Sequence, residues 1–496
     1  MQSKTVTESL ILEGQGTRFH FIMLLLAATS TCAYVGTVVS RGGSQHHARA
    51  AGLQLNFLKD AAVGDGGGNG LTAREREAGL VQWLESNGMY LSDKYTWGKT
   101  AHPLKVESET VEDFEVSGRG LLARKEIQQG ESIVSVPPVC LMTRARAVET
   151  LGERVVPETM GDYVALALLL IQERAKGDKS FWAPYIKILP TVEEVGQTWT
   201  WPQEDLDVLK GSGVVDASLN LRRKLQADFA QVEAQTIGPN GLEQSAFTWE
   251  AWEWAFSMLF SRAINLRETE ELALVPYADL LNHSPYCSSY FFYNKIPLSN
   301  DREVTLYADR SYAKNDQVLI SYGQKANSEL ILLYGFVVDR NLFDEVDITV
   351  SLDTEDPRYE EKVAFLKMQG LKPAMQFPLL IDRYSSELMQ FLRLCCVTPA
   401  MGALDEYRYA DRVSLQNERN AFTVLRDGCY AALAGYESSE EDDRKLMENG
   451  RMFATLSRNA RMAIKLRRNE KRILLRTIKT CDLGLEALRE LAEQQV

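Results

Sequence analysis

The sequence predicts an α+β fold followed by a helical region. Short apolar runs such as residues 133–136, bounded by turn-like residues, are typical of strands. Long, mostly apolar stretches such as residues 247–266 have the spacing and length of buried helices. From about Asp344 the chain changes to charged amphipathic helices with no internal repeat of fixed period. Together these observations favour a mixed domain and a second, helical one.

The first seventy residues have the composition of a targeting segment and a linker. Residues 19–39 are mostly apolar but are broken by Thr and Ser, which suits the core of a signal peptide better than a membrane span. The stretch that follows contains Arg, Ser and Ala and no acid until Asp60, as in transit peptides. We expect a two-part plastid signal, then a flexible linker at residues 64–70. The alternatives for the segment are a membrane anchor, or an upstream extension with translation starting at Met23. The alternative location is the cytoplasm, or a membrane to which the apolar segment anchors the chain.

Composition argues against several classes of protein. The 496 residues carry a net charge of −13, which argues against a nucleic-acid binder, because such a protein must neutralise phosphates. The seven cysteines are scattered without a CxxC or CxC pair, so we expect no metal site and no disulfide framework. No Walker A loop, GxGxxG turn or GxSxG elbow is present. After residue 70 no stretch is long and apolar enough for stable membrane insertion.

A few polar residues stand out in the remaining chain. Arg262 is the one charged residue in the apolar C-terminal half of a predicted helix. A buried arginine needs an anion or several carbonyls to satisfy it. The alternative to a functional role is a structural ion pair. His283 ends an apolar segment, whereas His102 lies in polar KTAHPLK and is expected in an exposed loop. Gly118 and Gly120 would let the backbone approach a ligand, or form a plain turn. The basic stretch at residues 458–479 is expected to be a solvated helix face rather than a docking site for an acidic partner.

Taken together, the motifs resemble the SET-domain protein methyltransferases, and within them the plant-type branch that includes the Rubisco large-subunit lysine methyltransferase. The resemblance depends on GRGLLARKEIQQGE, SFWAPYIKILP, WPQEDLDVLKGS, SRAINL, ADLLNHS, ISYGQKANSEL and LLYGF, in the expected order. It extends to YESSEEDDRKL, which resembles the substrate-binding domain of that branch. It implies a SET domain with small sheets and a pseudoknot-like crossing over residues 71–343, a helical insertion at about 145–265, and an all-α substrate-binding domain over 344–496.

The resemblance also implies a cofactor, S-adenosylmethionine, and a set of site residues. Asn282 and His283 would hold its adenosyl part, and Arg262 would meet its methionine carboxylate. Tyr322 would be the central catalytic residue and Tyr334 its partner, on either side of the transfer channel. The residues implied to bind the cofactor are Ser117, Gly118, Arg119, Arg262, Asp279, Asn282, His283 and Tyr322.

Lysine methylation places demands that such a site can meet. The target amine must lose a proton, although the pKa of lysine is about 10.4 in water. A dry aromatic channel beside a cationic sulfonium lowers that pKa by desolvation and by repulsion, so no histidine base is needed. Tyrosine hydroxyls can orient the neutral amine, and in-line attack is mostly a matter of alignment.

The substrate is expected to be a folded, non-histone protein that docks on the C-terminal helical domain of a monomeric enzyme. No cysteine-rich zinc segment follows LLYGF, unlike many enzymes that act on histone tails. The resemblance suggests Rubisco large subunit or another plastid protein such as aldolase. A related branch methylates a histidine in actin, but it has Asn where this chain has Ile264 and lacks the second tyrosine, here Tyr334. Histidine methylation and a catalytically silent SET-like scaffold remain the alternatives, and the number of methyl groups added stays open.

Overall fold

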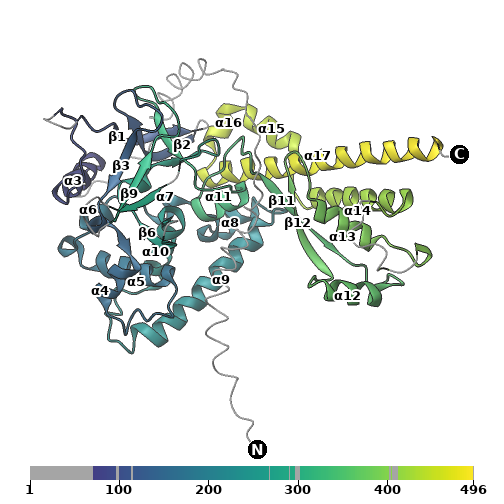
Figure 1. Cartoon of the computed structure of the whole chain (residues 1–496), viewed down its shortest axis with the longest axis horizontal. Coiled ribbons are helices and arrows are strands. Elements are labelled where there is room, and N and C mark those ends of the chain that lie inside the picture. Colours follow the sequence, from purple (N-terminus) through teal and green to yellow (C-terminus); the bar gives the residue numbers. More distant parts are fainter. Residues whose placement is uncertain are drawn as a thin grey trace, which may run out of the picture. The chain divides into compact units, whose positions relative to one another are not determined.

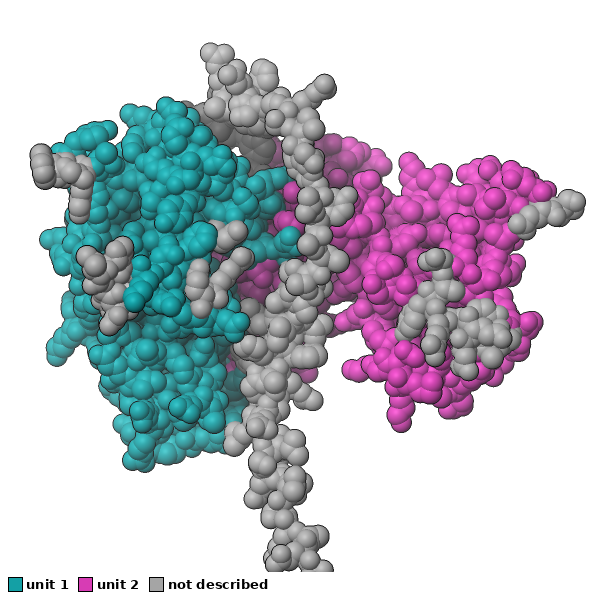
Figure 2. All heavy atoms as spheres, viewed as in Figure 1, with its two compact units in different colours: residues 1–191, 227–324 teal, residues 192–226, 325–496 magenta. Residues whose placement is uncertain are grey.

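The computed structural model describes residues 71–95, 100–112, 115–266, 269–289, 291–295, 302–401, 404 and 412–494. The expected targeting segment and linker at residues 1–70 lie outside the described residues. The packing of the chain defines two compact units, shown in Figure 2: the residues up to Thr191 with Ala227–Gln324, and Val192–Gln226 with Lys325–Val496. The domain boundaries proposed above, with a break at 343/344, stay a prediction.

The first unit contains a four-stranded sheet that joins distant parts of the sequence (Figure 1). Its strand order is β1 (Leu104–Glu112), β2 (Glu115–Ala123), β10 (Gln317–Ile320) and β7 (Asn282–His283). Strands β1, β2 and β10 are antiparallel neighbours, whereas β7 runs parallel to β10. The two-residue strand β7 is therefore held in register by β10, with Asn282 opposite Leu319 and His283 opposite Ile320.

Two three-stranded sheets complete the β-structure of this unit. One has the order β3 (Ser132–Val136), β9 (Arg302–Tyr307), β8 (Phe292–Lys295). The other has the order β4 (Met142–Thr143), β6 (Glu271–Leu274), β5 (Ile264–Leu266). Three small sheets agree with the expected SET-type architecture.

Helix α10 carries the arginine singled out by the sequence. Thr248 caps its N-terminus by accepting from the amide of Ala251, and its buried residues include Trp252, Phe256 and Leu259. The helix ends at Arg262 because Ala263 is extended, so the cation lies in the last turn, where the helix dipole favours it. The helices of this unit are α3 (Ala73–Ser86), α4 (Arg144–Leu151), α5 (Asp162–Ala175), α6 (Ala183–Ile186) and α10 (Trp249–Arg262), with the short turns η3 (Pro138–Cys140), η4 (Gly177–Lys179) and η7 (Ala278–Leu280).

The second unit is mostly helical, as predicted, and contains one two-stranded sheet that an all-α domain would lack. Strands β11 (Glu345–Ser351) and β12 (Ala374–Leu380) pair along their whole length. EVDITVS alternates buried and exposed side chains at its end, which is strand periodicity within a charged sequence. Helices α14 and α17 pack against each other beside this sheet. The helices are α7 (Val192–Val195), α8 (Gln203–Asp207), α11 (Asn327–Tyr334), α12 (Tyr359–Met368), α13 (Ser386–Cys395), α14 (Leu415–Ala434), α15 (Glu440–Glu448), α16 (Gly450–Thr455) and α17 (Arg458–Gln494), with the turns η5 (Thr198–Thr200) and η8 (Pro399–Met401). Helix α9 (Val214–Val232) contains the boundary between the two units, after Gln226, and the π-turn η6 (Glu233–Ile237) belongs to the first unit.

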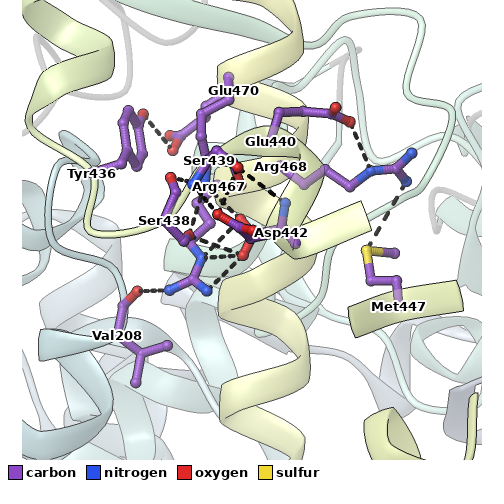
Figure 3. A network of polar contacts seen from close by, with 12 residues as sticks. Val208, Tyr436, Ser438, Ser439, Glu440, Asp442, Met447, Arg467, Arg468 and Glu470 are labelled. Atoms are coloured by element: carbon purple, nitrogen blue, oxygen red, sulfur yellow. Dashed lines mark hydrogen bonds and ion pairs between the residues drawn. The ribbon is translucent and has the colours of Figure 1, made fainter. Parts of the chain in front are cut away.

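The basic stretch on α17 is largely occupied by contacts within its own unit. Figure 3 shows Arg467 and Arg468 among the acidic and hydroxyl side chains around α15. Arg467 Nη2 lies 2.7 Å from Asp443 Oδ1, and Lys471 Nζ lies 2.6 Å from Asp443 Oδ2. Much of this stretch is thus a buried ion network, which differs from the solvated face that we expected.

His102 is also placed differently from the expectation. It is only 6% exposed, and its Nδ1 lies 3.2 Å from the amide of Leu104. Its ring meets Tyr277 edge-on at 5.8 Å between centroids. The prediction of an exposed loop was wrong, because a partner 175 positions away in the sequence (277 − 102) covers the ring.

Candidate active site

Asn282 is tied to the β1–β2 hairpin by its side-chain amide. Its Nδ2 donates to Thr110 Oγ1 at 3.1 Å and to the carbonyl of Arg119 at 3.2 Å. The side chain of Gln317 on β10 offers a third acceptor at 3.4 Å. Since β7 is only two residues long, these bonds, together with the pairing to β10, fix where it lies.

The glycine turn around Arg119 lies against the same amide. Thr110 Oγ1 donates to the carbonyl of Gly118 at 2.9 Å and lies 2.8 Å from Ser117 Oγ. Gly118 has φ +73°, a conformation that favours glycine. A Cβ on Gly120 would lie 2.8 Å from Thr110 Cγ2 and 3.0 Å from Asn282 Nδ2. The structure therefore brings together the predicted residues Ser117, Gly118, Arg119 and Asn282.

His283 and Tyr322 form a second predicted pair. The amide of Tyr322 donates to His283 Nδ1 at 3.0 Å, so that nitrogen accepts and a neutral ring carries its proton on Nε2. The two rings stack with centroids 5.0 Å apart. The Tyr322 hydroxyl donates to the carbonyl of Leu281 at 2.8 Å. The ring and the phenol are thus both oriented by the chain around β7.

Arg262, Asp279 and Tyr185 form a buried polar cluster. Arg262 Nη1 donates to Asp279 Oδ2 at 3.2 Å and to the Asp279 carbonyl at 3.1 Å. The Tyr185 hydroxyl donates to the same Oδ2 at 2.8 Å. The Asp279 side chain is fully buried and that of Arg262 is 19% exposed. The charge in the apolar helix thus meets an anion, as expected for a buried arginine.

Burial and pairing set the protonation of this cluster. Burial raises the pKa of Asp279, and the neighbouring Arg262 guanidinium opposes that shift. Burial alone would lower the pKa of Arg262, but the Asp279 carboxylate more than offsets it, so the net pKa is raised. Arg262 therefore stays cationic at any physiological pH.

Two buried atoms of this cluster have no hydrogen-bond partner among the described residues: Arg262 Nε and Asp279 Oδ1. An unsatisfied buried polar atom costs about 1–3 kcal/mol, so such atoms suggest a ligand. Both hydrogen bonds of Arg262 leave from Nη1, and the Nε edge is the one that matches a planar carboxylate. Asp279 Oδ1 can accept from an ammonium. The pair suits the carboxylate and amino groups of an amino-acid-like ligand.

Tyr334 lies in the second unit, where it ends α11 before Gly335, a left-handed cap. Burial, with a smaller contribution from Glu329, raises its pKa. Lys325 Nζ lies 6.0 Å from the centre of its ring. Its partnership with Tyr322 in the first unit stays a prediction.

Sequence reasoning missed three residues that hold the site in place: Thr110, Tyr185 and Gln317. Each lies in an ordinary setting, a strand or a short buried helix, and none carries a local pattern that marks it. In the part of the chain that the structure describes, no group of three or more His, Cys, Asp or Glu side chains is arranged to hold a metal ion. Across those same residues, no helix has the length and apolar character needed to cross a membrane.

Comparison with known proteins places this site in a family context. Residues 118–323 match the SET domain family, and residues 353–474 match the family described as Rubisco LSMT substrate-binding. Among solved structures, the SET domain of LSMT bound to lysine and AdoHcy gives a TM-score of 0.70 at 26% identity, covering 85% of this chain and 94% of that one. The structure of Rubisco LSMT bound to AdoMet gives a TM-score of 0.67 at 26% identity, covering 84% of this chain and 93% of that one.

Curated relatives have related activities and different targets. The chloroplastic [fructose-bisphosphate aldolase]-lysine N-methyltransferase of Arabidopsis thaliana is 28% identical, over 72% of this chain and 76% of its own length. The chloroplastic Rubisco large subunit N-methyltransferase of Pisum sativum is 29% identical, over 79% of each. The actin-histidine N-methyltransferase of Homo sapiens is 28% identical, over 85% of this chain and 73% of its own. The resemblance drawn from the sequence is confirmed, and the chain belongs to the SET-domain protein methyltransferases that carry a Rubisco LSMT substrate-binding domain.

Proposed function

We propose that this S-adenosylmethionine-dependent protein methyltransferase acts on lysine side chains of a folded, non-histone protein. The observation that carries the proposal is the buried Arg262–Asp279 pair, with one unpartnered atom on each side chain, in the same unit as the ordered Asn282, His283 and Tyr322. A SET-type fold with such a pair can hold a cofactor that ends in an amino acid. The expected cofactor agrees with the family.

S-adenosylmethionine fits the residues present. Arg262 Nε would donate to its carboxylate, and Asp279 Oδ1 would accept from its amino group. Asn282, His283 and the backbone of the Ser117–Gly118–Arg119 turn would hold the adenosyl part. When bound, the cofactor supplies an electrophilic methyl group on a sulfonium.

Tyr322 would align the target amine. Its phenol is anchored on the Leu281 carbonyl and its ring on His283, so little freedom remains to be lost in the reaction. Tyr334 would be its catalytic partner. The target lysine would release its proton to water, because desolvation lowers its pKa, and no base from this chain is needed. Residues 353–474 would bind the protein substrate, and we expect the enzyme to act as a monomer.

The residues at two positions of this chain favour lysine over histidine as the side chain that is methylated. Ile264 stands where the actin-directed branch has Asn, and Tyr334 is present where that branch lacks a second tyrosine. The histidine alternative is kept because the actin-histidine relatives match a larger share of this chain, 85% against 72–79% for the chloroplastic relatives, at similar identity. The chloroplastic relatives support a plastid location and a plastid substrate, Rubisco large subunit or aldolase.

The test is to incubate the chain with methyl-labelled S-adenosylmethionine and a plastid extract, hydrolyse the labelled bands and identify the methylated amino acid. We expect label on lysine in a few bands. In the matched Tyr322→Phe variant we expect a loss of roughly 100-fold or more, because one aligning hydroxyl is removed. Its affinity for S-adenosylhomocysteine should change little.

Other outcomes would redirect the proposal. Label on histidine would favour the actin-type reaction. Label in a cytosolic extract alone would overturn the plastid location. Full activity of Tyr322→Phe would remove Tyr322 from its role. If no extract is labelled, the silent scaffold becomes the better explanation.

A further inference from the structure

Tyr185 belongs to the buried Arg262–Asp279 cluster, and the proposed mechanism does not use it. It lies in α6 and is fully buried. Nearby, the Trp182 indole nitrogen donates to the Cys140 carbonyl at 3.0 Å, which fixes the start of this short helix. The hydroxyl of Tyr185 reaches Asp279 Oδ2 at 2.8 Å, across 94 positions of sequence. A buried tyrosine hydroxyl needs a hydrogen-bond partner, and here that partner is a carboxylate of the candidate site.

The bond has a geometric consequence for the cofactor-facing atoms. Asp279 Oδ2 accepts from both Tyr185 and Arg262 Nη1, so two donors fix the rotation of the carboxyl group. That rotation leaves Oδ1 as the unpartnered oxygen. It also holds the guanidinium by Nη1, which leaves Nε as the unpartnered donor.

Tyr185 also has the right charge behaviour for this task. Burial first, and then the Asp279 carboxylate, raise its pKa well above the usual value, so the hydroxyl keeps its proton and remains a donor. A hydrogen bond to an ionised carboxylate stabilises the ionised form. Tyr185 therefore opposes the rise that burial imposes on the pKa of Asp279.

We propose that Tyr185 is a positioning residue of the cofactor site: its hydroxyl holds Asp279 so that Asp279 Oδ1 and Arg262 Nε face the amino-acid end of S-adenosylmethionine. This inference rests on the proposed function. Tyr185 acts through Asp279 and does not itself touch the cofactor. Its effect is therefore confined to ligands that carry the amino-acid end.

The experiment compares two probes by calorimetry on the full chain: S-adenosylhomocysteine, which has the amino-acid end, and 5′-methylthioadenosine, which lacks it. Tyr185→Phe should weaken the binding of S-adenosylhomocysteine about tenfold. The affinity for 5′-methylthioadenosine should stay within twofold of the wild-type value. The matched control is Tyr312→Phe, which removes a 2.8 Å tyrosine–carboxylate bond, to Asp309, outside this cluster in the same unit. It should leave both affinities unchanged.

A pH series adds a second readout. The groups that shift the pKa of Asp279 are Arg262, Tyr185 and Arg119. Tyr322 in turn shifts the pKa of Arg262. Without the Tyr185 donor the pKa of Asp279 rises further, so more of the carboxyl is protonated at low pH. The ratio of wild-type to variant affinity for S-adenosylhomocysteine should therefore be larger at pH 6 than at pH 8.

The outcomes separate this inference from the function on which it rests. Selective loss of S-adenosylhomocysteine affinity supports the role of Tyr185. Equal losses for both probes, or no loss for either, overturn that role and leave the cofactor assignment standing. If the wild-type chain binds neither probe, the proposed function fails and this inference fails with it.

Discussion

Asn282 and Gly120 depend on each other. The Asn282 amide donates to oxygens of β1 and β2 because β2 passes close to it at Gly120. A Cβ there would come within 2.8 Å of both Thr110 Cγ2 and Gln317 Oε1. Such a contact is closer than side chains tolerate, so the strand or the amide must move.

Gly120→Ala should therefore weaken cofactor binding. We expect S-adenosylhomocysteine affinity to fall about tenfold and stability to fall by about 1–3 kcal/mol, since overpacking forces a shift in the Asn282 network. Calorimetry and urea unfolding measure the two effects. Gly79→Ala, on a helix with open space around the added Cβ, is the control and should be neutral or slightly stabilising. Unchanged affinity in Gly120→Ala would show that the amide is not fixed by this close approach.

Sequence reasoning found residues whose chemistry is odd in their local setting. A lone arginine in an apolar helix raises the question of its counter-ion, and the structure provides Asp279. Tyr185 raises no such question, because a tyrosine in an aromatic-rich segment looks like core packing. His102 was misjudged because its neighbours in sequence are polar while its neighbour in space is the ring of Tyr277. The pattern of neighbouring residues reflects only the local composition of the sequence. Whether a side chain is buried depends on contacts with residues that are distant in sequence.

At the scale of elements, α15 and α17 are joined by charges as well as by apolar packing. Asp443 on α15 is 1% exposed and accepts from Arg467 and Lys471 of α17. Lys471 Nζ also donates to the Ser438 carbonyl at 2.8 Å. Arg467 Nη1 donates to the Val208 carbonyl at 2.9 Å, as Figure 3 shows. One carboxylate thus balances two largely buried cations.

Asp443→Asn should destabilise the second unit by about 3 kcal/mol, because it leaves two buried cations without their counter-ion. The measurement is the urea midpoint of the full chain. Glu448→Gln on the same helix is the matched control: its partner Arg444 is 38% exposed and Glu448 itself 61%. That pair is solvated, so its loss should have little effect. A small effect of Asp443→Asn would mean that solvent or backbone carbonyls already satisfy the cations.

The elements themselves were predictable to the extent that their patterns are local. Helix α10 appears where the mostly apolar stretch at residues 247–266 predicts a buried helix. The β11–β12 sheet was missed because its paired residues are 23 to 35 positions apart (374 − 351 and 380 − 345) inside a region of helical charge patterning. The charged helical region that follows Asp344 is interrupted between α16 and α17, since Leu456 is extended. Local propensity does not reveal such a break.

At the scale of the whole molecule, buried titratable groups make stability depend on pH. In the second unit burial raises the pKa of Glu470 to about 7, of Glu345 to about 7 and of Asp344 to about 6. In the first unit burial, together with nearby Arg124, lowers the pKa of His102 to about 4. Because each of these pKa values differs between the folded and the unfolded chain, each group changes the free energy of unfolding over a defined range of pH.

The two kinds of group act in opposite directions. A carboxyl with a raised pKa binds its proton more tightly in the folded chain, so its contribution is greatest at low pH. That contribution is lost as pH rises from the unfolded value of about 4.3 toward 7. His102 is neutral when buried, so its contribution is present at high pH. It is lost as pH falls from about 6.5 to about 4. Acid therefore weakens the first unit through His102, and rising pH weakens the second through its carboxyls.

Glu470→Gln isolates one of these effects. Glu470 is 4% exposed and accepts from Ser212 Oγ at 2.7 Å and from Tyr436 OH at 3.0 Å, with Lys471 as its charged neighbour. Glutamine imitates the protonated form, so the variant should gain about 2–3 kcal/mol relative to wild type between pH 5 and pH 8. Urea unfolding at both pH values measures the gain. Glu437→Gln, whose ion pair with Lys210 is 66% exposed on each side, should show no such pH dependence. Equal effects of Glu470→Gln at pH 5 and pH 8 would mean that Glu470 is already ionised throughout this range, held so by its two donors and Lys471.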